Sequence, residues 1–168
     1  GPDQADPPDQ GRILVAAVLF EGGLAPLSMA LGWLLGRSPL EGFAWAPGDA
    51  VLGVLAALPM YAAFRLGLRW PVGPLARIKR FFDEEMAPLL EGRPASDLAL
   101  ISLAAGVGEE MLFRGVVQGA LARWLGPWWG LAWASLLFGL LHPITRAYIV
   151  LAGLLGAYLG AVWMATGN

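Results

Sequence analysis

The sequence Gly106-Val107-Gly108-Glu109-Glu110-Met111-Leu112-Phe113-Arg114-Gly115 places two adjacent carboxylates and one guanidinium in an otherwise apolar segment. Residues 98–107 before the carboxylates carry no charge, and neither do residues 116–121 after the guanidinium. Ionisable side chains are costly to bury at membrane depth, so they usually mark a functional site or the ion pair that supports one. The stretch therefore predicts a membrane helix with a polar site inside it.

Helical spacing divides the three charged side chains between two faces. Glu110 and Arg114 are four residues apart, which places them on nearly the same line of a helix. Glu109 lies about 100° away, on the adjoining face. We therefore expect Glu110 to pair with Arg114, and Glu109 to face another element. Gly106 falls between the two carboxylates and leaves space for a helix, a water or a substrate. The alternative is a purely structural ion pair that ties helices together.

The composition is that of a membrane protein. Of the 168 residues, 57% are hydrophobic and 14% are charged, whereas average soluble domains carry roughly 25% charged residues. The net charge of −2 gives no support to nucleic-acid binding. The absence of cysteine excludes disulfides, thiolate metal sites and a cysteine nucleophile in this chain. We therefore expect an integral membrane protein that forms one domain.

Long apolar runs predict an all-α fold, a polytopic membrane helix bundle of about five transmembrane helices. The expected spans are about 12–35, 49–69, 96–122, 127–142 and 145–165. Residues 74–91 place apolar and charged side chains on different faces, which predicts one interfacial amphipathic helix. Residues 1–11 are polar and rich in proline, so we expect a disordered tail before a single membrane domain of residues 12–168.

Basic residues predict the orientation of the bundle in the membrane. Most of them lie around the loop after the second expected span, namely Arg65, Arg69, Arg77, Lys79, Arg80 and Arg93. The loop after the first expected span carries only Arg37. The positive-inside rule then puts the N-terminus and the amphipathic helix in the cytoplasm, and the C-terminus outside.

Two other polar side chains lie near membrane depth. His142 is the only histidine, and it follows Phe138 by four residues, which places both on one helix face. A lone histidine is more often a packing residue, but a setting with one other polar cluster favours a functional role. Glu21, inside the first span, is either a second functional carboxylate or a residue at a helix break with access to water.

Several intramembrane protease chemistries are excluded by the sequence. It contains no His-Glu-x-x-His zinc motif, which one histidine could not form. It also contains no Gly-x-Ser-Gly nucleophile segment and no Gly-x-Gly-Asp in an apolar helix. Serine, paired-aspartate and that type of zinc mechanism therefore have no candidate residues in this chain.

The order Glu109-Glu110-x-x-x-Arg114 on one helix and Phe138-x-x-x-His142 on the next resembles the first two motifs of a known family. This is the CAAX-protease and bacteriocin-processing family, also called CPBP or Abi, and the resemblance covers roughly residues 72–168. It implies a multi-helix intramembrane endopeptidase, a hydrolase that we expect in the bacterial plasma (inner) membrane. Eukaryotic relatives trim the C-terminal residues of prenylated CAAX proteins. Bacterial relatives are linked to bacteriocin maturation, self-immunity and membrane-protein processing.

The resemblance also implies a role for each motif residue. Glu109 would be the general base that activates water. His142 would orient the water or help to stabilise the oxyanion, with Phe138 packed beside it. Glu110 and Arg114 would hold the helix and polarise the site. Whether a metal takes part is disputed for the family: Glu109 and His142 are the candidate ligands of a zinc ion, and a glutamate-type mechanism is the other view. The implied partners are membrane lipid and a peptide or lipidated protein substrate.

The family has a third motif that this sequence does not contain. It is a histidine followed four residues later by Asn or Asp on the helix after the fifth span, and the sequence has one histidine in total. We expect the C-terminal family helix to be missing from this chain, activity of the chain alone to be incomplete, and a partner subunit to complete the site. One histidine with two adjacent glutamates is also an incomplete zinc site, because catalytic zinc usually has three protein ligands.

Two non-proteolytic interpretations are left open by the sequence. In the first, the protein is a non-catalytic membrane scaffold or bacteriocin-immunity protein that binds a peptide or a partner helix. In the second, the glutamates and the arginine belong to a proton or substrate pathway across the membrane. The second is disfavoured, because no inverted repeat or pair of broken helices is evident.

Overall fold

The computed structural model describes residues 10–168, and within that range every regular element is a helix. The predicted all-α class is therefore confirmed. The expected tail lies outside the described residues as far as residue 9, whereas Gln10 and Gly11 already belong to the first helix.

The described chain runs through its helices in the following order. The first two are α1 (Gln10–Leu34) and α2 (Pro47–Arg69), and a surface segment follows as α3 (Pro74–Phe81), the π-helical η1 (Phe82–Met86) and α4 (Ala87–Leu90). The next helix is continuous from α5 (Ala95–Glu110) through the π-helical η2 (Met111–Gln118) to α6 (Gly119–Leu125). The last two are α7 (Pro127–Leu140) and α8 (Arg146–Thr166).

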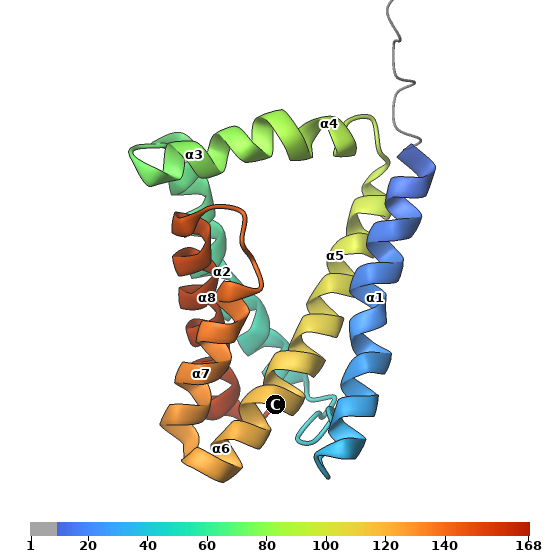
Figure 1. The fold of residues 1–168 in the computed structure, drawn as a ribbon, viewed down its shortest axis with the longest axis vertical. Helices are drawn as coiled ribbons and strands as arrows, with labels where there is room; N and C mark the ends of the chain where they lie inside the picture. The colour runs from blue at the N-terminus through green and yellow to red at the C-terminus, as the bar shows by residue number, and fades with distance from the viewer. Residues whose placement is uncertain (1–9) are drawn as a thin grey trace, which may run out of the picture.

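The long helices stand in two groups that the surface segment joins at one end (Figure 1). One group is α1 with α5, which pack along each other. The other is α7 with α8, and α2 lies beside them. The surface segment α3–η1–α4 crosses the end at which α1 begins, and the C-terminus lies at the opposite end (Figure 1). The predicted orientation requires that the start of the first span and the amphipathic helix lie at one end and the C-terminus at the other.

Among residues 10–168, three helices are long and apolar enough to cross a membrane: Val15–Leu34, Pro47–Arg69 and Arg146–Thr166. The second of these, α2, buries none of its side chains within the protein. A helix that is apolar all round and unburied fits a position against lipid. The expected spans 96–122 and 127–142 fall on α5–η2–α6, which carries the charged cluster, and on α7.

The helix α7 is too short to cross a bilayer. Its 14 residues extend about 21 Å, compared with a hydrocarbon core about 30 Å thick. It begins at Pro127 and at the exposed Trp128 and Trp129, which favour a helix start and a membrane interface. The other end of α7 therefore falls short of the opposite interface.

The buried hydrophobic core surrounds η2. Its members come from η2, α7 and α8: Leu112, Phe113, Phe138 and Ala152. Leu24 of α1 packs against this cluster. The helices α1 and α5 approach closely at Gly108, where a Cβ would lie 2.6 Å from the Glu21 carbonyl oxygen. The charged stretch therefore lies where α1, α7 and α8 meet the helix that contains η2.

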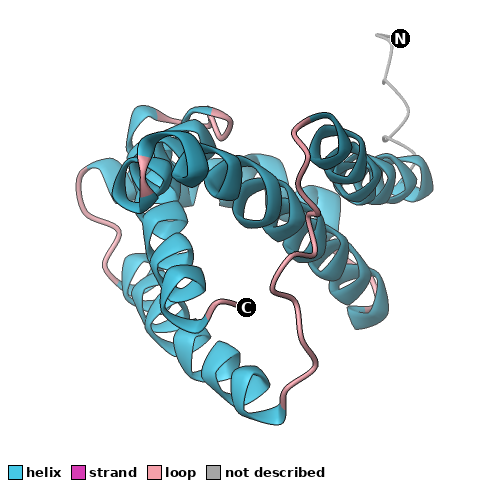
Figure 2. Cartoon of the chain, turned by 90° about the horizontal axis from the view of Figure 1, so that it is seen from below, coloured by secondary structure: helices cyan, strands magenta, loops and turns pink. Residues whose placement is uncertain are grey.

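The loop between α1 and α2 is tied to both η2 and the end of α8. Seen from below, the helices surround the C-terminal residues in projection (Figure 2). The Ala44 N–H donates to Asn168 Oδ1 at 3.2 Å, and Asn168 Nδ2 donates to the Ala44 carbonyl oxygen at 2.9 Å. Arg37 Nε donates to the Gly115 carbonyl oxygen at 2.7 Å. These bonds close the bundle at the end opposite the surface segment.

Candidate active site

The two carboxylates occupy the last turn of α5, and the helix becomes π-helical directly after them, at Met111. π-helical turns inside α-helices occur frequently at functional sites. The helix α5 buries only Gly108, whereas most of η2 is buried. Glu109 and Glu110 therefore stand at the boundary between an exposed part and a buried part of one long helix.

Arg114 carries a buried positive charge beside the carboxylates. Its Nη1 lies 3.3 Å from Glu110 Oε1, so the expected pairing is present. The Arg114 side chain is 4% exposed and that of Glu110 is 46% exposed. The guanidinium also donates from Nη2 to the Gly156 carbonyl oxygen at 3.1 Å and lies 5.1 Å above the Phe138 ring. These contacts to α7 and α8 offset part of the cost of burying the charge.

Gln118 repeats the Arg114 contact one turn further along both helices. Its Nε2 donates to the Gly160 carbonyl oxygen at 3.1 Å, and its side chain is 1% exposed. The two glycines on α8 have no side chain to hold the helices apart, so both donors reach the backbone. Gln118 is not among the site residues expected from the sequence. The available signal was a polar side chain in an apolar run, four residues after Arg114.

Glu109 faces His142 across the gap between α5 and the α7–α8 loop. The Glu109 Oε1 and His142 Nε2 atoms are 3.6 Å apart, and the side chains are 25% and 26% exposed, respectively. The other ring nitrogen, Nδ1, is 2.7 Å from the Phe138 carbonyl oxygen. A carbonyl oxygen can only accept, so Nδ1 carries a hydrogen and donates it. Nε2 is therefore the nitrogen presented to Glu109, at a distance slightly longer than a hydrogen bond.

His142 lies in the loop after α7. The expected span 127–142 had instead placed it in the helix. The helix ends at Leu140, and Pro143 disfavours a helical conformation at the residue before it. The His142 N–H instead donates to the Gly139 carbonyl oxygen at 3.0 Å. The rings of Phe138 and His142 remain in contact, with centroids 4.5 Å apart. The two residues are neighbours as expected, although a turn and not a helix joins them.

Tyr148 of α8 is a further neighbour of His142 that the sequence analysis did not identify. The two ring centroids are 6.2 Å apart, and the Tyr148 ring lies 6.1 Å from the Phe82 ring of η1. The Thr145 hydroxyl accepts a hydrogen bond from the Tyr148 N–H at 3.0 Å and so caps the start of α8. An aromatic row therefore leads from Phe138 through His142 and Tyr148 to the surface segment.

Gly106 and Gly108 differ in their surroundings. A Cβ at Gly106 would meet no atom within 4 Å, so no neighbouring helix packs there. Close approach occurs at Gly108, against the backbone of Glu21. This approach brings Glu21 into electrostatic interaction with Glu109. The helix-packing role considered for Gly106 belongs to Gly108, and space for a water or a substrate at Gly106 stays a prediction.

The residues present do not by themselves fit a catalytic zinc ion. Within the described part of the chain, no group of three or more His, Cys, Asp or Glu residues is arranged to hold a metal. Glu109 and His142 supply two donors, and catalytic zinc usually has three protein ligands.

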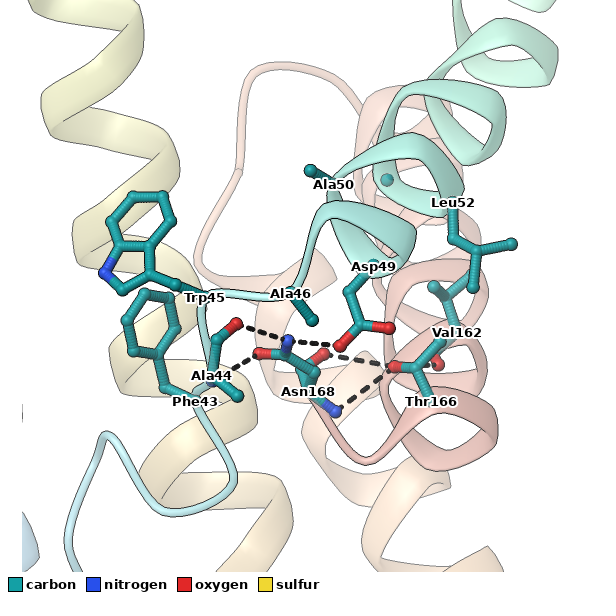
Figure 3. Close-up of a pocket in the computed structure, with 11 residues that line it drawn as sticks. Phe43, Ala44, Trp45, Ala46, Asp49, Ala50, Leu52, Val162, Thr166 and Asn168 are labelled. Carbon is teal, nitrogen blue, oxygen red and sulfur yellow. Dashed lines mark hydrogen bonds between the residues drawn. The ribbon is translucent and has the colours of Figure 1, made fainter.

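A separate pocket of about 240 Å³ lies at the other end of the bundle (Figure 3). The α1–α2 loop, the first turns of α2 and the end of α8 form it. Asn168 lies in this pocket and donates from Nδ2 to the Asp49 carboxylate at 2.7 Å. Tyr148 and Thr166 are about 27 Å apart along α8. The pocket is therefore distinct from the site that contains Glu109 and His142.

An all-helical bundle with three candidate membrane-spanning helices, and with a partly buried glutamate–histidine pair, indicates an integral membrane protein with a polar internal site. Residues 92–168 match the model of one protein family, whose description is "Type II CAAX prenyl endopeptidase Rce1-like". The resemblance to the CAAX-protease family is thereby confirmed over residues 92–168. All six expected site residues lie within the matched segment. No curated protein and no solved structure matches the chain.

Proposed function

We propose that this protein is an intramembrane endopeptidase in which Glu109 activates a water molecule for attack on a peptide bond. The observation that carries the proposal is the approach of Glu109 Oε1 to His142 Nε2 at 3.6 Å inside the segment that matches the family. One water beside the two atoms can hydrogen-bond to both of them. Glu109 removes a proton from this water while His142 orients it.

The hydrogen bond from His142 to Phe138 supports this division of roles. Because Nδ1 donates to the Phe138 carbonyl oxygen, the ring is held in one orientation with Nε2 toward Glu109. Arg114 acts at a distance from the water, since it is buried and its contacts run to Glu110, Gly156 and Phe138. Glu110 and Arg114 therefore hold the catalytic turn against α7 and α8 rather than touching the substrate.

The surroundings favour a substrate that is itself associated with the membrane. The site lies near the end of a helix that finishes within the depth of the bilayer, and exposed apolar side chains cover α2 and much of α5. A peptide or lipidated protein, such as a prenylated CAAX protein, reaches such a site along the lipid phase. Membrane lipid is the second partner, because it surrounds the helices and carries the substrate to the site. Bacteriocin peptides that undergo processing are a second substrate class for the same reaction.

Basic residues support a location in the bacterial plasma membrane with the surface segment on the cytoplasmic side. Arg77 and Arg80 lie on α3, and Arg93 follows α4. The positive-inside rule then places this end, together with the N-terminus, in the cytoplasm.

Cleavage of a farnesylated CAAX peptide by the purified protein in proteoliposomes tests the proposal. The products are identified by mass spectrometry for the wild-type protein, Glu109→Gln and a control, Glu84→Gln. Glu84 is an exposed carboxylate on η1, so its substitution should leave the rate unchanged. Glu109→Gln removes the base and should lower the rate by about 100-fold or more. If Glu109→Gln still supports the cellular function without cleavage, the protein is a membrane scaffold or immunity protein instead.

A further inference from the structure

We propose that Tyr148 is a further catalytic residue, whose phenol hydroxyl donates a hydrogen bond to the substrate carbonyl oxygen as negative charge develops on it. The inference rests on the proposed peptidase function and deepens it. No motif of the sequence analysis includes this tyrosine. Its position beside His142 is a product of the fold, because the α7–α8 loop returns the chain past the end of α7.

The Tyr148 ring stands beside His142, one member of the glutamate–histidine pair. Its centroid is 6.2 Å from that of His142. Its phenol also lies within electrostatic range of the Glu109 carboxylate. The residue is partly buried, so one part of it packs into the protein while another remains accessible. A substrate carbonyl that approaches the water bound by Glu109 and His142 would therefore come near this side chain.

The Tyr148 hydroxyl is not used in the fold of the described residues. Within residues 10–168 it makes no hydrogen bond to the protein, whereas its own N–H is bonded to Thr145. Tyr158, ten residues later on α8, provides the contrast, because its hydroxyl donates to the Ala56 carbonyl oxygen at 2.9 Å. A half-buried tyrosine hydroxyl usually has a partner. The free donor of Tyr148 points to a partner that arrives with the substrate.

Other donors near the pair are less suited to this role. His142 uses Nδ1 for the Phe138 carbonyl oxygen and presents Nε2 to Glu109. Arg114 has buried Nε and Nη1 atoms without a hydrogen bond, but its side chain is only 4% exposed. A substrate carbonyl could not reach that guanidinium without moving Phe138, which lies against it. Tyr148 is the donor that is both close to the pair and accessible.

The packing around Tyr148 also holds its ring in place before the substrate binds. Phe82 of η1 contacts the ring on one side, and His142 lies on another. The Thr145 cap fixes the backbone of the first turn of α8. A donor that is already positioned costs no reorganisation during the reaction, which is the condition for strong oxyanion stabilisation.

The step in which Tyr148 acts is an addition followed by an elimination. Glu109 takes a proton from the water, the water oxygen bonds to the carbonyl carbon, and the carbonyl π pair moves onto the carbonyl oxygen. Tyr148 donates its hydrogen bond to that oxygen and keeps its proton throughout. The electron pair then returns, the C–N bond breaks, and Glu109 gives the proton to the leaving nitrogen. The products are a carboxylic acid and an amine.

Steady-state kinetics of Tyr148→Phe with the farnesylated CAAX peptide test this role, with Tyr158→Phe as the matched control. Tyr148→Phe keeps the ring and its contacts to Phe82 and His142, so a purely structural role predicts no kinetic change. Loss of an oxyanion donor should lower kcat by about 100-fold with KM unchanged. Tyr158→Phe loses a bond that holds α2 to α8, so it should lower thermal stability and leave kcat close to that of the wild type.

Glu109→Gln, assayed alongside, separates the two proposals. If Glu109→Gln is inactive while Tyr148→Phe cleaves with the wild-type kcat, Tyr148 is not catalytic and the peptidase function stands. A rise in KM alone, with kcat unchanged, would also contradict the role of Tyr148 as an oxyanion donor. If Glu109→Gln cleaves as well as the wild type, or the wild type does not cleave, the peptidase function is refuted and the role of Tyr148 with it.

Discussion

Arg114 donates a hydrogen bond to the carbonyl oxygen of Gly156 at 3.1 Å, and this bond joins the charged turn of η2 to α8. The carbonyl belongs to a glycine whose missing side chain leaves room for Phe138. A Cβ at Gly156 would lie 3.3 Å from the Phe138 side chain, which the same guanidinium covers. One buried cation therefore fixes the relative positions of η2, α7 and α8, on which the site is built.

The first prediction concerns the ion pair of Arg114 and Glu110, whose side chains differ in burial. Arg114→Met should lower the free energy of unfolding by about 2–4 kcal/mol, because the ion pair, the bond to Gly156 and the contact with the Phe138 ring are all lost. Glu110→Gln should cost about 1 kcal/mol or less, since water can replace a partner that is 46% exposed. Denaturant titration in detergent micelles measures both. Equal losses, or a larger loss for Glu110→Gln, would show that Arg114 is not the anchor.

A second prediction compares two glycines. Gly160→Ala should destabilise the protein by about 1–3 kcal/mol, because its Cβ would collide with the Gln118 amide and lie 2.5 Å from Leu131. Gly106→Ala meets open space and should be neutral or stabilising by up to about 1 kcal/mol, as alanine is the better helix former. Adding Gln118→Ala to Gly160→Ala should recover part of the loss, which a double-mutant cycle measures. Strict additivity would exclude a direct contact between residues 118 and 160.

The contacts that the sequence predicts are those made within a single helix or turn. Glu110 and Arg114 pair because four residues of helix bring them together wherever the helix lies. Phe138 and His142 are neighbours for the same reason, and a turn at the end of α7 preserves the contact. The all-α class follows similarly from long apolar runs with no strand periodicity. Local spacing is sufficient for these features.

Contacts between helices could not be predicted, because they depend on how the helices approach. Gln118 gains its role only because Gly160 brings α8 close to η2. Tyr148 reaches the site through a short loop whose direction no spacing rule gives. Two glycines, Gly106 and Gly108, are equally small in the sequence, and only the structure shows that Gly108 is the one that contacts α1.

A third prediction tests whether the surface segment takes part in the site. Phe82→Ala removes the ring that contacts Tyr148 and should lower kcat/KM by about three- to tenfold, the value of one aromatic contact. Leu90→Ala, at a partly exposed position of α4 on the same segment, is the control and should have no effect. Peptide cleavage in proteoliposomes measures both variants. An unchanged kcat/KM for Phe82→Ala would mean that the surface segment only contacts the membrane.

The most direct test of the proposed mechanism compares the cleavage rates of two variants, each with one of the adjacent glutamates replaced. Glu109→Gln and Glu110→Gln are assayed with the same farnesylated CAAX peptide, under single-turnover conditions and with folding checked for each protein. Glu109 faces His142, so its substitution should lower the cleavage rate by about 100-fold or more. Glu110 faces Arg114, so its substitution should lower the rate by about tenfold or less. A Glu109→Gln protein that cleaves at the wild-type rate, or a greater loss for Glu110→Gln, would contradict the assignment of Glu109 as the catalytic base.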